Sequence, residues 1–299
     1  MQTETTRFDS DGLTLSGSFF LPEDHDSSET SPLVIPCSGF TGLCSIHPAR
    51  FARFLTRRGH LCFGFDYRGF AESEGPVGRV LLEEQVRDIR HATSFAREDP
   101  RVDPDRIFLL GWGMGAGLVL DAARHLEGIA GLIAVNGFYQ GDRVQRALRT
   151  ADDYQRFVRE VDQERCQRVR SGEARFVDPF EIYPLDEQSR RYVDEVLRPS
   201  PGYQADRYSY ELAESLLRWN VEAHAPQMSR PLLIAHGDRN HLHPTDEAKH
   251  LHAAYGGPKQ LFWLEGAGHT EFMDDEDPKF LALAEQIDQW LGQQLGDGA

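Results

Sequence analysis

One motif of the chain places a glycine at the position where its chemistry needs a nucleophile. Residues 111–115 read Gly-Trp-Gly-Met-Gly; they follow the apolar run 107–110 and precede the apolar run 118–120. A tight turn between a strand and a helix is the setting of the G-x-S-x-G elbow, whose serine attacks acyl carbons. Because Gly113 has no side chain, this turn lacks the group that forms an acyl-enzyme. The remaining motifs therefore decide which chemistry is open to the chain.

Four more short motifs follow predicted strands, and together with the elbow they make an ordered series. They are Gly39-Phe40-Thr41-Gly42, Asp66-Tyr67-Arg68-Gly69, His236-Gly237-Asp238-Arg239-Asn240 and Gly266-Ala267-Gly268-His269. Each is weak evidence alone, but five in this order at the ends of strands are specific. In this arrangement the chain resembles the α/β-hydrolase superfamily, most closely its capped esterase and acyl-hydrolase branches. The resemblance covers nearly all of the chain outside residues 141–228.

The resemblance assigns catalytic positions in the order nucleophile, acid and histidine. The nucleophile falls on Gly113, the acid on Asn240 and the base on His269. In a working triad a carboxylate fixes the tautomer of the histidine and stabilises its protonated form. The carbonyl oxygen of Asn240 is expected to orient a ring N–H of His269 without supplying a negative charge. We therefore expect His269 to hold a proton less readily than a triad histidine does.

An oxyanion hole and a substrate pocket are the other parts that the resemblance implies. In this fold the hole consists of backbone N–H groups, which map to Phe40 and Met114. Backbone donors need no particular side chain, so the glycine of the elbow leaves them in place. The predicted substrate-binding residues are Trp112, Tyr139 and Tyr208, since aromatic side chains with polar tips suit a medium-sized, partly apolar ligand.

Other residues near these motifs are weaker candidates for the missing groups. Four candidates for a replacement nucleophile surround the predicted oxyanion loop: Cys37, Ser38, Cys44 and Ser45. None of them stands on a sharp turn beside an obvious base, so a structural role is favoured for each. Asp238 is an alternative acid two residues before the expected position.

The segment after the apolar run 231–235 is rich in histidine. His241 and His243, with Asp246 close by, invite a metal hypothesis. Zinc ligands, however, usually come at helix or finger spacings with supporting partners, and no such spacing is present. A solvated loop near the mouth of the site is the favoured interpretation. The sequence therefore predicts no metal and no cofactor.

Alternating strands and helices have to position these residues. Apolar runs of strand length lie at 33–36, 62–65, 107–110, 129–135, 231–235 and 260–264. Stretches of helical period separate them, which predicts an α/β fold with a mostly parallel central sheet flanked by helices. Residues 141–228 interrupt this pattern with a polar segment of helical period and no strands. We predict a core of residues 1–140 and 229–299 and an inserted helical cap at 141–228.

Charge and composition exclude several classes of function. The 299 residues carry a formal net charge of −16, from 48 acidic and 32 basic residues. Nucleic acids and anionic membrane surfaces both require basic patches, so neither is an expected partner. No signal peptide and no apolar run of the roughly 20 residues that span a bilayer is visible, which favours a cytoplasmic protein. A small-molecule substrate is expected, and the sequence gives no indication of the oligomeric state.

Three functions remain open. The favoured one is an enzyme that acts on a small carbonyl or acyl compound by non-hydrolytic or nucleophile-independent chemistry. His269 would be the base, and the N–H groups of the oxyanion hole would stabilise an enolate or oxyanion. A lyase, cyclase or isomerase would fit it. The second is a serine ester, thioester or amide hydrolase whose nucleophile at Gly113 was substituted. The third is a ligand-binding pseudo-hydrolase. Removing a nucleophile to trap a bound substrate needs only one substitution. Because Asn240 replaces the expected acid as well, natural divergence is favoured over engineering.

Overall fold

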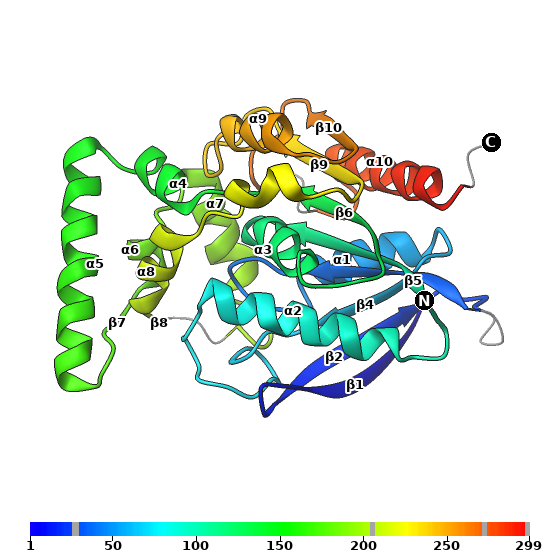
Figure 1. Cartoon of the computed structure of the whole chain (residues 1–299), viewed down its shortest axis with the longest axis horizontal. Coiled ribbons are helices and arrows are strands. Elements are labelled where there is room, and N and C mark those ends of the chain that lie inside the picture. The colour runs from blue at the N-terminus through cyan, green and yellow to red at the C-terminus, as the bar shows by residue number, and fades with distance from the viewer. Residues whose placement is uncertain (26–29, 204–206, 271–273, 297–299) are drawn as a thin grey trace.

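The computed structural model describes residues 1–25, 30–203, 207–270 and 274–296, and an eight-stranded sheet forms its centre (Figure 1). The strands lie in the order β1-β2-β4-β3-β5-β6-β9-β10. β2 pairs antiparallel with both β1 and β4, and the remaining neighbours are parallel. Their bounds are β1 (Gln2–Ser10), β2 (Leu13–Leu21), β3 (Ser31–Cys37), β4 (Leu61–Phe65), β5 (Val102–Trp112), β6 (Ile129–Val135), β9 (Leu232–Gly237) and β10 (Lys259–Leu264). The predicted α/β fold with a mostly parallel sheet is confirmed.

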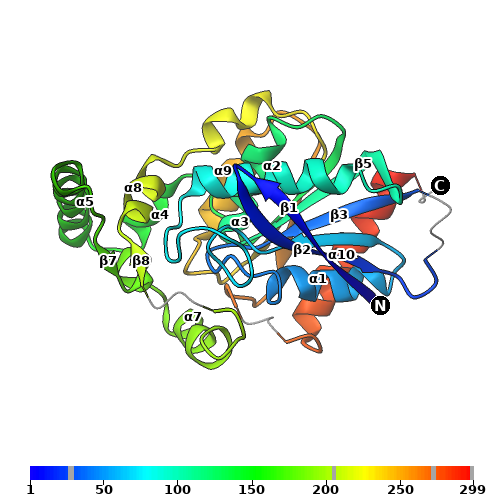
Figure 2. The same cartoon turned by 90° about the horizontal axis from the view of Figure 1, so that it is seen from below.

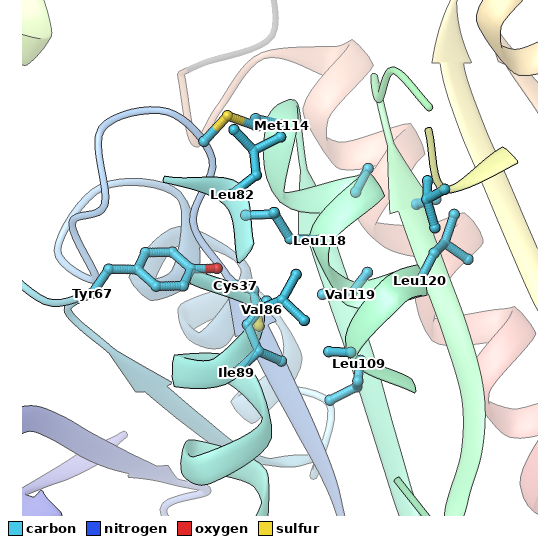
Figure 3. Close-up of a cluster of buried hydrophobic side chains, with 14 of the residues drawn as sticks. Cys37, Tyr67, Leu82, Val86, Ile89, Leu109, Met114, Leu118, Val119 and Leu120 are labelled. Atoms are coloured by element: carbon cyan, nitrogen blue, oxygen red, sulfur yellow. The ribbon is translucent and has the colours of Figure 1, made fainter. Parts of the chain in front are cut away.

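Helices cover both faces of this sheet (Figure 2). They are α1 (His47–Thr56), α2 (Leu82–Arg97), α3 (Met114–Ala123), α9 (Thr245–Ala254) and α10 (Pro278–Leu295). Val86 of α2 and Leu118 of α3 belong to the core on one face, part of which Figure 3 shows. Phe51 of α1 and Phe280 of α10 belong to the core on the other face. No helix in the described part of the chain is long and apolar enough to cross a membrane.

Burial on both faces explains the continuous apolar sequences of the central strands. Residues 107–112 of β5 and all of β9 are buried. Neighbouring side chains alternate between the two cores: Leu109 packs on the α2 and α3 side, and Phe108 on the α1 and α10 side. Because the parallel strands all end at the same edge, the loops that carry the predicted site residues meet there.

Residues 141–228 lie between β6 and β9 in the chain and form a group of helices to one side of the sheet (Figure 1). The helices are α4 (Gly141–Ala147), α5 (Ala151–Ser171), α6 (Pro179–Ile182), α7 (Glu187–Tyr192), a π-helix (Val193–Leu197), α8 (Glu211–Arg218) and a 3-10 helix (Glu222–Gln227). The expectation of no strands here is wrong, because β7 (Phe176–Val177) pairs antiparallel with β8 (Tyr208–Ser209). Strands of two residues are too short to show a period of two in the sequence.

Polar side chains start three helices of this segment. The Thr150 hydroxyl accepts a hydrogen bond from the Asp153 N–H at the start of α5, and Asp178 and Asp186 cap α6 and α7 in the same way. Such caps satisfy N–H groups that the first helical turn leaves without partners. Gly172 ends α5 with a left-handed φ of +77°, a conformation that glycine adopts without strain. Local sequence therefore sets the ends of these helices.

Candidate active site

The backbone between β5 and α3 keeps the sharp turn of an elbow. Gly113 has φ +61° and ψ −124°, and its N–H donates to the Val135 carbonyl oxygen at 2.9 Å. A side chain at this φ would be strained, so glycine relieves strain here. The flanking glycines are required by close backbone contacts. A Cβ on Gly111 would lie 2.2 Å from the Gly115 carbonyl oxygen, and one on Gly115 would lie 2.3 Å from the Ser38 carbonyl oxygen. The backbone therefore has the turn of an elbow with a glycine at its centre.

The space beside Gly113 opens toward one histidine. Among the described residues, a Cβ placed on Gly113 would meet His269 Nε2 at 3.6 Å and His269 Cε1 at 3.8 Å. These are ordinary van der Waals distances, so the position has room for a side chain. Crowding does not explain the glycine.

Asn240 contacts His269 with the polarity opposite to the one expected. Its Oδ1 accepts a hydrogen bond from the His243 backbone N–H at 2.9 Å, which fixes the orientation of the amide. The Nδ2 group therefore faces His269 Nδ1, at 3.1 Å, and donates to it. The accepting Nδ1 carries no proton, so the neutral ring carries its N–H at Nε2, the nitrogen nearest Gly113. The expectation that the Asn240 carbonyl oxygen orients a ring N–H is wrong.

The cost of turning the Asn240 amide and the lowered pKa of His269 both stabilise this neutral tautomer. Turning the Asn240 amide over would oppose its Nδ2 to the His243 N–H and leave a buried donor without an acceptor, at a cost of about 1–3 kcal/mol. Burial also lowers the pKa of His269 well below its usual value, and the neighbouring His243, His236 and His47 lower it further. At neutral pH His269 is thus a neutral ring that presents a hydrogen-bond donor to the elbow.

Asn136, which follows β6, holds the loop that carries this histidine. Its Nδ2 donates to the carbonyl oxygens of His269 at 3.1 Å and Gly268 at 3.3 Å, and its Oδ1 accepts from the Gly237 N–H at 2.8 Å. The residue is fully buried and has a positive φ of +50°. Sequence reasoning missed Asn136, although a lone polar residue at the end of an apolar strand was a usable signal. It acts as a positioning residue that ties three strand ends together.

His243 is a buried structural partner rather than part of a solvated loop. Its Nδ1–H donates to the Asn136 carbonyl oxygen at 2.6 Å, and its Nε2 accepts from the Tyr183 hydroxyl. His236 Nε2–H donates to the His243 carbonyl oxygen at 2.9 Å. Burial lowers the pKa of His243 to about 3 and that of His236 to about 4, so both are neutral. His241 is exposed, as expected for the loop. No group of three potential metal ligands occurs among the described side chains.

The two residues predicted to supply oxyanion-hole amides, Phe40 in the loop after β3 and Met114 in the elbow, both line the pocket beside Gly113. Met114 is the first residue of α3, where N–H groups have no partner within the helix and the helix dipole favours negative charge. A Cβ on Gly39 would lie 3.3 Å from Met114 N, which shows how closely the loop after β3 passes the elbow. Within the described residues, neither the Met114 N–H nor the Phe40 N–H donates a hydrogen bond. Their role as an oxyanion hole stays a prediction.

Two tyrosines fix the loop after β3 through its carbonyl oxygens. The Tyr67 hydroxyl donates to the Ser38 carbonyl oxygen, and the Tyr208 hydroxyl donates to that of Phe40, each at 3.2 Å. The Tyr208 ring also lies 5.1 Å from the Phe40 ring. Because both hydroxyls bond to carbonyl groups, they orient the loop without occupying its N–H groups.

Comparison with known proteins now decides the family. The family model described as "Serine aminopeptidase, S33" (Hydrolase_4) matches residues 28–276. The chain belongs to this α/β-hydrolase family. Over 287 residues it is 25% identical to the "Uncharacterized 31.7 kDa protein in traX-finO intergenic region" of Escherichia coli, covering 96% of the chain and 97% of that protein.

Two further likenesses span most of this hydrolase-family chain. It is 25% identical to polyketide transferase ATR5 of Stachybotrys chlorohalonatus over 283 residues, 89% of each protein. The crystal structure of the α/β hydrolase GrgF from Penicillium sp. sh18 superposes with a TM-score of 0.80 at 20% identity, covering 99% of this chain and 100% of that one. At this identity the structural likeness establishes the shared fold.

A pocket above the elbow joins the α/β-hydrolase core to the inserted segment. Its cavity volume is about 60 Å³, and together with open solvent at its mouth about 560 Å³ of space is not filled by protein atoms. The core contributes Phe40, Thr41, Trp112, Gly113, Met114, Leu242, His243, His269 and Thr270, and the inserted segment contributes Phe180, Tyr183, Leu185, Ser189, Tyr192, Val193 and Leu197. Among these lining residues there is no Asp, Glu, Lys or Arg. The pocket is therefore apolar with a few neutral polar groups, as small-molecule sites commonly are.

Of the three predicted substrate-binding residues, only Trp112 lies in the wall of this pocket. Tyr139 is fully buried outside it, and its backbone N–H donates to the Glu247 carboxylate at 2.8 Å. Tyr208 is also fully buried and acts through Phe40. Tyrosine is a residue type that suits a pocket, but the sequence could not show that the surrounding core encloses both Tyr139 and Tyr208.

The replacement groups considered from the sequence lie outside the pocket. Cys37 and Cys44 are buried, and burial raises the pKa of each thiol well above its usual value, which disfavours a thiolate. Ser38 is fully buried and Ser45 is exposed. Asp238 is exposed and accepts a hydrogen bond from the Gly266 N–H at 2.8 Å, so it does not serve His269. None of them therefore lines the pocket.

Proposed function

We propose that the chain is an enzyme that converts a small carbonyl or acyl compound without forming an acyl-enzyme. The observation that supports this proposal is that Asn240 donates to His269 Nδ1, which leaves a ring N–H at Nε2 beside Gly113. In the proposal the backbone amides of Phe40 and Met114, two residues that line the same pocket, are the second and third donors. Residues 141–228 act as a cap that closes the pocket over them. A lyase, cyclase or isomerase reaction needs such donors and no nucleophilic side chain.

In this proposal the donors act where negative charge develops on the carbonyl oxygen. A carbonyl held by three N–H groups is polarised, and an enolate or tetrahedral oxyanion formed from it is stabilised in a site of low polarity. His269 serves as a neutral hydrogen-bond donor rather than as the general base expected from the sequence. Its use as a base would first require the Asn240 amide to turn over, at the cost of about 1–3 kcal/mol given above.

Deuterium exchange next to a ketone tests this function. In this test a buffer base or the solvent takes the C2 proton of 1-phenylbutan-1-one while the three donors stabilise the enolate oxygen, and D₂O returns a deuteron. We therefore expect the protein to accelerate loss of the C2 proton signal in ¹H NMR spectra. Replacing His269 by Phe removes one donor and should slow the exchange about 100-fold or more. The wild-type protein should form no adduct with a fluorophosphonate. Exchange at the background rate would favour a non-catalytic binding protein, and a covalent adduct would contradict the proposal.

A substituted serine hydrolase is the second candidate, and the room beside Gly113 favours it. The relative named a polyketide transferase is consistent with acyl chemistry on this fold. This candidate predicts that Gly113→Ser alone restores p-nitrophenyl ester turnover and fluorophosphonate labelling. The favoured proposal predicts that the single variant stays slow, because His269 offers the new hydroxyl an N–H instead of a lone pair.

A further inference from the structure

Among the described residues, the inserted segment adds no free polar side-chain group to the pocket. Its polar residues in the lining are Tyr183, Ser189 and Tyr192. The Tyr183 hydroxyl donates to His243 Nε2, and the Tyr192 hydroxyl is hydrogen-bonded to His47 Nε2 at 3.3 Å. The Ser189 hydroxyl oxygen is buried and closed off from the pocket. A ligand therefore meets no unengaged hydroxyl group on this side.

The remaining side chains on this side of the pocket are all hydrocarbon. They are Phe180, Leu185, Val193 and Leu197. The Phe180 ring faces the core, with its centroid 6.1 Å from that of the Phe40 ring. The accessible surface of the whole pocket is almost wholly apolar. Such a wall favours apolar ligand groups, because contact with it removes them from water.

The core side of the pocket differs, because it holds the polar groups that a ligand can reach. His269 Nε2 is the ring nitrogen nearest Gly113, and Thr41 belongs to the same side of the lining. Two other polar atoms of this side, Trp112 Nε1 and Thr270 Oγ1, are closed off from the pocket. A ligand thus finds polar partners near the elbow and apolar surface on the inserted segment.

We propose that the substrate is an uncharged ketone or acyl compound whose carbonyl carries a hydrocarbon group, alkyl or aryl, that binds against the inserted segment. The place of the carbonyl at the elbow rests on the proposed function, whereas the apolar group rests on the pocket wall alone. A hydroxyl on that group would lose its hydrogen bonds to water and gain none from the wall. A carboxylate is disfavoured further, because no described Lys or Arg lines the pocket.

Two matched pairs of ketones test this proposal, and each pair exchanges a methyl group for a hydroxyl group of similar size. At the aryl end the pair is 1-(4-methylphenyl)butan-1-one and 1-(4-hydroxyphenyl)butan-1-one. At the alkyl end it is 1-phenylpentan-1-one and 4-hydroxy-1-phenylbutan-1-one. Isothermal titration calorimetry at pH 7 gives the four dissociation constants without requiring a reaction.

We expect the hydroxyl to weaken binding in at least one pair about tenfold or more, the equivalent of about 1.4 kcal/mol or more. The pair that shows the loss identifies the end of the ligand that contacts the inserted segment. Equal binding within both pairs would overturn the proposal, and so would a failure of both methyl compounds to bind.

Two substitutions by tryptophan place the binding site. Leu185 lines the pocket from the inserted segment, whereas Leu281 is 44% exposed on α10 and is the control. We expect Leu185→Trp to weaken binding of the methyl compounds about tenfold or more, because the indole occupies space that the ligand needs. Leu281→Trp should leave binding unchanged. Leu185→Phe, with its smaller ring, should act in the same direction, and circular dichroism verifies that each variant is folded.

Unchanged binding in folded Leu185→Trp and Leu185→Phe proteins would overturn the proposal, because the ligands would then bind elsewhere. Discrimination between methyl and hydroxyl ligands without any exchange activity would leave the ligand class standing and refute the proposed function instead. Exchange activity without discrimination would refute this inference alone.

Discussion

The elbow and the loop after β9 carry Gly113 and Asn240, the residues at the predicted nucleophile and acid positions, and the two differ in their relation to His269. At Gly113 the backbone keeps its turn, with φ +61°, while the side chain is gone. At Asn240 the contact with His269 is kept, at 3.1 Å, but donor and acceptor are exchanged. A catalytic position can thus change by deletion or by reversal. Reversal has the larger consequence, because it decides whether the ring nitrogen of His269 that faces Gly113 carries a proton or a lone pair.

Repairing both positions at once gives the largest expected effect. In the Gly113→Ser, Asn240→Asp double variant the carboxylate accepts from Nδ1, and Nε2 becomes a base for the new hydroxyl. We expect this variant to react with a fluorophosphonate about 10³- to 10⁴-fold faster than Gly113→Ser alone, the range by which triads depend on their acid. Mass spectrometry of the intact protein measures the adduct over time.

The Asn240→Asp single variant is the control and should form no adduct, because it has no nucleophile at the elbow. Equal rates for the Gly113→Ser variant and the double variant would show that the polarity of Asn240 does not limit the chemistry. If both variants also react fast, the substituted-hydrolase candidate replaces the favoured one.

Alanine substitutions at two elbow glycines distinguish the cost of a steric clash from the cost of a positive φ. A Cβ on Gly115 would lie 2.3 Å from the Ser38 carbonyl oxygen, whereas one on Gly113 clears its neighbours. We expect Gly115→Ala to lower the free energy of unfolding by about 3 kcal/mol, since backbone has to shift. Gly113→Ala should lower it by about 1–2 kcal/mol through the positive φ alone. Urea denaturation followed by circular dichroism measures both. Equal losses would mean that the elbow is not held against the loop after β3.

The buried histidines near His269 predict a loss of stability in mild acid. The pKa of His236 falls from 6.5 to about 4 on burial, so below pH 6.5 the unfolded chain binds a proton that the folded protein excludes. Stability is therefore full above pH 6.5 and declines toward pH 4. Between pH 7.5 and 5.0 His236 alone should account for about 2 kcal/mol. Urea midpoints at the two pH values measure the decline.

Two substitutions assign that decline to buried rings. His236→Gln should reduce it by about the same 2 kcal/mol, whereas Gln at the exposed His241 should leave it unchanged. If both variants decline like the wild type, the protein admits water or protons to this cluster, and the neutral state of the neighbouring His269 loses its physical basis.

The smallest expected effect concerns the loop that carries the Phe40 amide. Tyr208→Phe removes the hydroxyl that donates to the Phe40 carbonyl oxygen and should slow the exchange reaction about fivefold, in line with one neutral hydrogen bond. Tyr210→Phe is the matched control, because its hydroxyl bonds to Glu160 away from the pocket. A loss of stability without any change in rate would assign Tyr208 a purely structural role.

The fold and the positions of the motifs around the site could be predicted from the sequence because both depend on local patterns. Apolar runs buried on both faces of the sheet fixed the strands, and glycines under steric demand, such as Gly115, marked the elbow. Prediction failed where the outcome depends on distant groups. The orientation of Asn240 is set by the His243 N–H, and Tyr139 is enclosed by core that its neighbours in sequence do not form.

The tautomer of His269 tests the central claim most directly. In a ¹⁵N-labelled protein, long-range ¹H–¹⁵N correlation spectra distinguish a protonated ring nitrogen from one that carries a lone pair. We predict that His269 is neutral at pH 7, with the proton on Nε2 and the lone pair on Nδ1, and that Asn240→Asp moves the proton to Nδ1. A wild-type ring that carries its proton on Nδ1 would contradict the reversal on which the proposed chemistry rests.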